Sequence, residues 1–147
     1  MNVIDPIELG KVVTACQRGL LRLSAAPGSA FNGFPKGSCG LAADIIGRIL
    51  KETLQYEGVY VCGRHHPSLN SEATHAWFEI GHFLIDVTYN QFPRTNLTGW
   101  VFDGGTEWHK QFSSLERRKG YCAPSGWPCY PYDGYKAALE EVKAAYI

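Results

Sequence analysis

The chain has 147 residues, of which 45% are hydrophobic and 13% aromatic, so it is long enough for one domain with a hydrophobic core and short for two. Its 14 basic and 14 acidic residues give a formal net charge of zero, which argues against a nucleic-acid binder that relies on neutralising phosphates. From the length of the chain we therefore expect a single domain over residues 1–147. No apolar run approaches the ~18 residues of a membrane span, and the N-terminus lacks the pattern of a secretory signal. We expect the protein to stay in the cytoplasm or to be secreted by a signal-independent route.

The first predicted element is a helix over residues 6–24. Asp5 is suited to cap its N-terminus, Pro6 suits the first helical position, and Glu8 completes a capping box, in which side chains and backbone N–H groups bond reciprocally. Apolar residues then recur at helical spacing as far as Leu23. Residues 25–36 hold two prolines and two glycines and predict a loop.

A second helix is predicted to begin at about Ser38. It has a broad apolar face, and Gly58 lies just beyond its expected end. Residues 59–62 predict a short strand, and residues 64–74 predict a polar loop. The apolar face of the helix consists of Leu41, Ile45, Ile46, Ile49, Leu50 and Leu54.

The clearest strands are residues 75–80 and 83–89. Gly81-His82 between them fits a two-residue hairpin turn with glycine first. Residues 90–133 are rich in glycine, proline and aromatic residues and carry few regular signals, whereas residues 135–146 predict a final short helix. Helices followed by an antiparallel sheet predict an α+β fold.

Cys39 is the strongest candidate for chemistry. It stands at the predicted start of the second helix, between Gly37-Ser38 and Gly40. The free N–H groups and the positive dipole end of a helix N-terminus stabilise a thiolate, and the same N–H groups are able to hold the oxyanion of a tetrahedral intermediate. The flanking glycines let a substrate approach the backbone. We therefore predict a nucleophile at Cys39 and inert, packed thiols at Cys16 and Cys62.

The register of the hairpin adds His75 and Asp86 to this site. With Gly81-His82 as the turn, Trp77 opposes Asp86, so His75 lies diagonal to Asp86 on the same face of the sheet. Diagonal neighbours are ~7 Å apart at the backbone, within reach of an imidazole–carboxylate hydrogen bond. A buried carboxylate needs such a partner because burying it unpaired is costly. We predict that Asp86 orients His75, which acts as the base for Cys39.

These segments resemble parts of a known superfamily of cysteine enzymes. The run Gly37-Ser38-Cys39-Gly40-Leu41-Ala42 resembles the nucleophile helix of papain-like proteins. Residues 75–80 and 83–88 look like the His and Asp strands of transglutaminase-like proteins and arylamine N-acetyltransferases, in the same Cys, His, Asp order. The resemblance covers residues 30–92 and implies a papain-like core, in which the nucleophile helix packs on an antiparallel β-sheet.

The resemblance also implies chemistry through a thioester on Cys39, as in a peptidase, amidase, glutamine deamidase or acyl transferase. Small bacterial cell-wall amidases and several secreted bacterial effectors share this catalytic core. The chain is shorter than the larger members of the superfamily and has no clear substrate subdomain, so a peptide, a protein glutamine and a small amide all stay open as substrates. We expect no cofactor. Candidate residues for the oxyanion or the substrate are Ser38, Asn32, Gln91 and Trp77.

Two other interpretations stay open. The spacing of Cys62 with His65-His66 is ligand-like, and Cys122 and Cys129 would add two thiolates to a structural zinc site. The odd number of cysteines, five, and the lack of a secretory signal otherwise indicate reduced thiols. The chain is alternatively a catalytically inactive binding module of the same fold, with an aromatic-rich surface for a protein partner. Outside these sites, His109 and His65-His66 are expected to be exposed polar residues.

Overall fold

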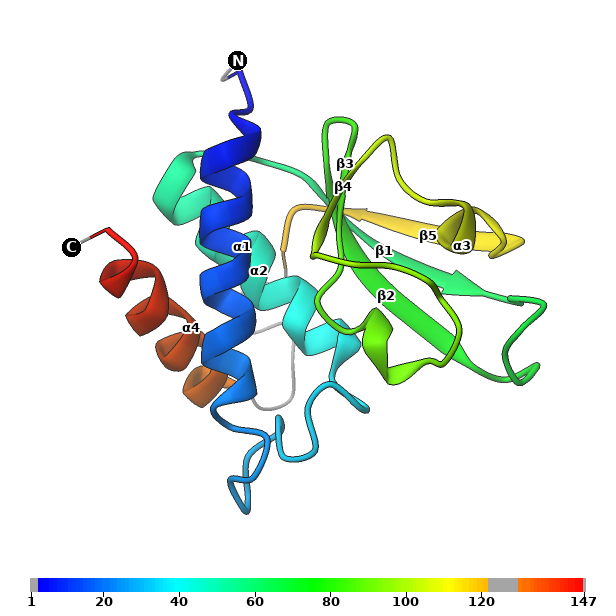
Figure 1. Cartoon of the computed structure of the whole chain (residues 1–147), viewed down its shortest axis with the longest axis horizontal. Coiled ribbons are helices and arrows are strands. Elements are labelled where there is room, and N and C mark those ends of the chain that lie inside the picture. Colours follow the sequence, from blue (N-terminus) through cyan, green and yellow to red (C-terminus); the bar gives the residue numbers. More distant parts are fainter. Residues whose placement is uncertain (1–2, 122–129, 147) are drawn as a thin grey trace.

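The structure, a computed structural model, describes residues 3–121 and 130–146 (Figure 1). The elements in chain order are α1 (Pro6–Leu21), α2 (Cys39–Leu54), β1 (Val59–Arg64), β2 (Thr74–Ile80), β3 (Phe83–Ile85), the 3-10 helix η1 (Tyr89–Gln91), β4 (Val101–Asp103), α3 (Glu107–Lys110), β5 (Ser114–Lys119) and α4 (Tyr132–Ala144). None of the helices in these two ranges has the length and hydropathy to cross a membrane.

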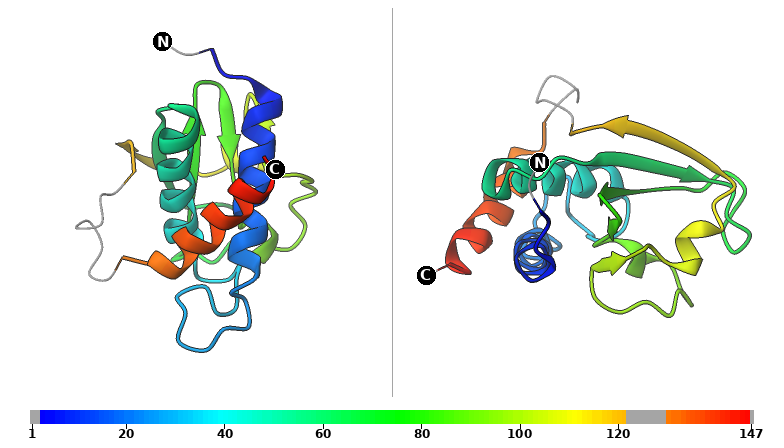
Figure 2. Two further views of the ribbon diagram at one scale, coloured as in Figure 1. Left: turned by 90° about the vertical axis from the view of Figure 1, so that its left-hand side faces the viewer. Right: turned by 90° about the horizontal axis from the view of Figure 1, so that it is seen from above.

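The five strands form one antiparallel sheet in the order β4-β3-β2-β1-β5. Helix α2 packs on β2 and β1, while α1 and α4 pack on each other and on α2. The helices α1, α2 and α4 therefore gather on one side of the molecule and the strands on the other (Figure 2). The predicted α+β class, with a helix that begins at Cys39 packed on an antiparallel sheet, is confirmed.

Helix α1 begins as predicted but without the full capping box. The Asp5 side chain accepts hydrogen bonds from the N–H groups of Ile7 (2.9 Å) and Glu8 (3.4 Å). The predicted return bond from Glu8 is wrong, because the Asp5 N–H donates to the Tyr56 hydroxyl at 2.9 Å and the Glu8 carboxylate accepts from the hydroxyl of Tyr146. The helix ends at Leu21, three residues earlier than predicted, where the backbone continues in single turns.

Helix α2 begins at Cys39, and its first turn receives no hydrogen bond from the Ser38 side chain. The Ser38 hydroxyl instead donates to the carbonyl of Pro35 at 3.3 Å. The helix ends at Leu54, and Gln55 takes the left-handed conformation at φ 59°. Gly58 was predicted to mark this end and has another role: a Cβ there would lie 2.2 Å from the Glu79 carbonyl oxygen, so glycine permits the close approach of the two chain segments.

The hairpin has the predicted turn and register, with Phe78 opposite Ile85 and Ile80 opposite Phe83. Strand β3 is shorter than predicted, because it ends at Ile85 instead of residue 89. The Asp86 side chain accepts the N–H of Thr88 at 2.9 Å, and this local bond turns the chain away from β2. The Asp86 N–H then pairs with the carbonyl of Trp100 at 3.0 Å.

The two faces of the sheet bury different clusters. Phe78, Ile80 and Ile85 pack with α1 and α2 in the main core. The opposite face carries a second cluster that α3 covers, made of Val61, Trp77, Leu84, Trp108 and Phe112. This aromatic cluster is the setting of the candidate site. Strands β4 and β5 and helix α3 lie in the region with few sequence signals, and α4 begins at Tyr132, three residues earlier than predicted.

Candidate active site

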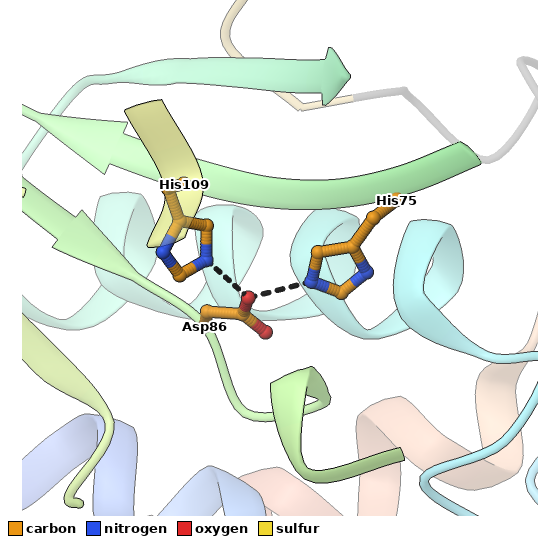
Figure 3. Close-up of side chains that lie close together, drawn as sticks. All are labelled: His75, Asp86 and His109. Atoms are coloured by element: carbon orange, nitrogen blue, oxygen red, sulfur yellow. Dashed lines mark hydrogen bonds and ion pairs between the residues drawn. The ribbon is translucent and has the colours of Figure 1, made fainter. Parts of the chain in front are cut away.

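Asp86 is the centre of a buried hydrogen-bond network (Figure 3). Its Oδ1 accepts the backbone N–H of Thr88 at 2.9 Å and the Thr88 hydroxyl at 3.2 Å. Its Oδ2 lies 2.6 Å from Nε2 of His75 and 2.7 Å from Nε2 of His109. The side chains of His75 and Asp86 are 0% exposed and that of His109 is 2% exposed, so solvent does not compete for these bonds.

His75 is the second residue of β2, and aromatic side chains surround its ring. The ring centroids of Phe92, Trp108 and Trp77 lie 5.0, 5.7 and 5.8 Å from that of His75. Because a carboxylate only accepts hydrogen bonds, Nε2 of His75 carries the proton of its bond to Asp86. In the neutral ring Nδ1 is then unprotonated, and it is buried without a conventional hydrogen-bond partner in residues 3–121 and 130–146. His75 therefore presents a basic nitrogen that is free to take a proton.

Cys39 lies at the first position of α2 and is partly exposed. Burial opposes its ionisation, but the neighbouring His75, together with the Ala76 N–H, lowers the pKa of the Cys39 thiol below its ordinary value. Burial instead raises the pKa of the Cys16 thiol and that of the Cys62 thiol. All three are free thiols, as predicted, and among them Cys39 has the environment of a nucleophile.

The electrostatics of His75 and Asp86 support the same arrangement. Burial favours the neutral imidazole, but the charge and hydrogen bond of Asp86, helped by Cys39, raise the pKa of His75 to about 9. Burial likewise opposes ionisation of Asp86, but the charge of His75 and the hydrogen bonds from His109 and His75 hold the pKa of that carboxyl well below its usual range. The network therefore favours an ionised Asp86 and an imidazolium at His75, and it makes Cys39 easier to ionise than an ordinary thiol.

The predicted oxyanion and substrate residues have other contacts. The Ser38 hydroxyl donates to Pro35, the Gln91 amide donates to the Thr88 carbonyl at 3.0 Å, and the Trp77 indole donates to Glu79 at 2.9 Å. Asn32 is exposed in the loop before α2. Because these three side-chain donors are engaged, the backbone N–H groups in the first turn of α2 are the better candidates for an oxyanion hole.

His109 and His66 were expected to be exposed, and this is wrong, since each is only 3% exposed. His66 contacts the Trp108 carbonyl through Nε2 at 2.8 Å and accepts the Ser68 N–H through Nδ1 at 3.1 Å, so it holds α3 in place. His109 joins the site through Asp86. The sequence carries one weak signal for it, a Thr-x-x-His run at a helix start: Thr106 caps α3 by accepting the His109 N–H at 2.9 Å.

His75, Asp86 and His109 are also the right residue types for a metal ion, with ligand atoms within 4.8 Å of one another. Their spacing fits hydrogen bonds better. Two ligands of a tetrahedral zinc ion are about 3.3 Å apart at ordinary bond lengths, whereas each imidazole nitrogen lies 2.6 or 2.7 Å from the same carboxylate oxygen. The zinc site considered from the sequence is not supported by His66, whose two nitrogens are engaged; Cys122 and Cys129 lie outside the described residues.

Comparison of the chain with protein-family models, with curated proteins and with solved structures found no match. The functional argument is therefore made from the geometry of the site.

Proposed function

We propose that this chain is a thiol-dependent amide hydrolase or acyl transferase that acts through a thioester on Cys39, with a papain-like, transglutaminase-like arrangement of its nucleophile helix and sheet. The observation that carries the proposal is the buried bond between His75 Nε2 and Asp86 at 2.6 Å. It assigns the proton of the neutral ring to Nε2 and leaves Nδ1 as the base beside Cys39, whose pKa is lowered by His75.

The first half-reaction forms the thioester. The Cys39 proton moves to Nδ1 of His75, and the thiolate attacks the carbonyl carbon of an amide, so that a C–S bond forms and the carbonyl electron pair moves to oxygen. The N–H groups at the start of α2 stabilise that oxyanion. When the intermediate collapses, the C–N bond breaks and the leaving ammonia or amine takes the proton from Nδ1 of His75.

The second half-reaction releases the acyl group. Nδ1 of His75 takes a proton from water, the oxygen attacks the thioester carbon, and the C–S bond breaks to give a carboxylic acid and the Cys39 thiolate, which the imidazolium reprotonates. If an amine attacks in place of water, the product is a new amide and the reaction is acyl transfer. Both outcomes require the same three side chains, so the site supports the reaction class, with a peptide, a protein glutamine or a small amide as the acyl donor.

An activated ester tests this chemistry without knowledge of the natural substrate. We expect p-nitrophenyl acetate to acetylate Cys39 with a burst of nitrophenolate and a mass increase of one acetyl group on the intact protein. The Cys39→Ala variant should show neither signal. The matched control is Cys62→Ala, which removes a partly buried thiol with a raised pKa and should keep both signals.

A burst and an adduct that persist in Cys39→Ala would contradict the assignment of the nucleophile. Once the wild-type protein passes this test, amide donors are compared by the same intact-mass measurement. A thioester adduct from glutamine peptides with release of ammonia would indicate deamidation or transglutamination, and one from cleaved peptides would indicate peptidase activity.

A further inference from the structure

A second imidazole lies on the carboxylate of the site, from a different element than the first. His109 in α3 and His75 in β2 approach the same oxygen of Asp86 from two sides (Figure 3), at 2.7 and 2.6 Å. We propose that His109 is a positioning residue for the reaction: it donates Nε2–H to Asp86, fixes the carboxylate against His75, and never touches the thiol or the substrate. The inference deepens the proposed function and rests on it for its effect on Cys39.

Thr106 sets the tautomer of His109. The Thr106 hydroxyl oxygen accepts the backbone N–H of His109 at 2.9 Å and lies 2.7 Å from Nδ1 of the same residue. Because the Asp86 carboxylate only accepts, Nε2 carries the proton, and in the neutral ring Nδ1 then accepts the proton of the Thr106 hydroxyl. A neutral ring that accepts at Nδ1 carries its proton at Nε2, which is the nitrogen that faces Asp86. The cap of α3 therefore makes His109 a hydrogen-bond donor to the carboxylate.

Packing holds the His109 ring in this position. The ring centroids of Trp77 and Trp108 lie 4.8 and 4.9 Å from that of His109, and both indoles meet the imidazole at a steep angle. His66 in turn bonds the Trp108 carbonyl at 2.8 Å, so α3 is tied to the loop after β1. A ring packed against two indoles gives a donor of fixed direction, which is what the orientation of a carboxylate requires.

The hydrogen bonds of Asp86 show what this donor adds. Thr88 supplies both bonds to Oδ1, and the two imidazoles supply the bonds to Oδ2. Without His109, Oδ2 would keep a single partner in a site that solvent does not reach, and the buried negative charge would be less well stabilised. The carboxylate would then rotate or bind a proton more readily, and His75 would lose part of the support for its imidazolium.

The test compares His109→Leu with His109→Gln and Thr106→Val, using the alkylation rate of Cys39 and the ultraviolet absorbance of its thiolate as functions of pH. We expect His109→Leu to slow alkylation at neutral pH about 10- to 100-fold, the factor for a lost hydrogen bond to a charged group, and to move the inflection that reports His75 to lower pH. His109→Gln should recover most of the rate because its amide keeps an N–H donor at similar reach, and Thr106→Val should fall between the two.

The matched control is His82→Leu. His82, in the turn between β2 and β3, bonds Asp103 of β4 at 2.6 Å, but both side chains are largely exposed, so this change should leave rate and inflection unchanged. A His109→Leu protein with the wild-type rate and inflection, or with an inflection moved to higher pH, would overturn the proposal. If His109→Leu does not fold, the other two variants decide the proposal. Equal pH profiles of Cys39 alkylation for wild type, His109→Gln and Thr106→Val would then overturn the proposal, provided that the His109 tautomer in Thr106→Val is also unchanged.

Imidazole nitrogen resonances separate this inference from the proposed function. In wild-type protein His109 should carry a proton on Nε2, and Thr106→Val should shift the balance between its tautomers. An Nδ1–H tautomer in wild type, which has no proton on Nε2, would overturn the inference whatever Cys39 does. A wild-type Cys39 that reacts no faster than Cys62 would instead count against the proposed function and leave the tautomer result to decide the role of His109.

Discussion

Replacement of Asp86 by asparagine removes the charge of the network while keeping its shape. Burial by itself favours the neutral ring of His75, but Asp86, helped by Cys39, raises the pKa of His75 from the ordinary 6.5 to about 9. At 1.36 kcal/mol for each pH unit, the imidazolium would lose about 3 kcal/mol of support, a factor of a few hundred in the ratio of imidazolium to neutral imidazole. The amide also keeps only one of the two acceptor oxygens, so its NH2 group faces either the Thr88 N–H or the two Nε2–H groups of the imidazoles.

The assay is alkylation of Cys39 by a small thiol reagent across a range of pH, resolved by site with mass spectrometry. We expect Asp86→Asn to slow the reaction at neutral pH about 100-fold and to give Cys39 the profile of an ordinary thiol, because no imidazolium stabilises its thiolate. The control is Asp103→Asn, which breaks a histidine–aspartate pair of the same 2.6 Å length at an exposed position. An Asp86→Asn profile that matches wild type would refute the electrostatic reasoning.

Two further predictions concern stability. Gly19→Ala should lower the free energy of unfolding by about 1–3 kcal/mol, because a Cβ would lie 2.5 Å from the Ala137 carbonyl oxygen of α4. Gly10→Ala on the same helix is the control: its Cβ would meet nothing within 4 Å, so the change should be neutral or stabilising. Chemical denaturation measures both variants, and equal effects would contradict the α1–α4 packing. Relative to Asp86→Asn, the wild-type protein should gain stability as pH rises toward 3.8, the usual aspartate pKa, because the pKa of Asp86 is lowered by folding. It should hold this gain up to pH 6.5 and lose the His75 contribution as pH rises from there through about 9, because the pKa of His75 is raised. A stability difference independent of pH would contradict this coupling.

The part of the site that could be predicted from the sequence depends on local patterns. A two-residue turn fixes the register of β2 and β3, and extending that register by one residue beyond Ile85 puts Asp86 on the side of the sheet where His75 lies. Cys39 follows from the apolar periodicity that begins just after it. These patterns lie within residues 75–86 and 37–54, each a single continuous run, so no long-range information is needed to interpret them.

His109 could not be predicted in the same way, because it reaches Asp86 from 23 positions away along the chain. Its place depends on α3, a four-residue helix, and on β4, a three-residue strand, and neither is long enough to show a period. Strand β5 is exposed at all six positions, so the alternation that identifies a half-buried strand is missing. The early end of β3 likewise follows from the Asp86 side chain, whose bond to the Thr88 N–H replaces strand pairing.

The activation of Cys39 is tested most directly by competition between thiols of the wild-type protein. With limiting iodoacetamide at neutral pH, Cys39, whose pKa is lowered, should be modified at least about tenfold faster than Cys62, whose pKa is raised, and buried Cys16 should stay unmodified until the protein unfolds. Modification of Cys39 and Cys62 at equal rates would contradict the account.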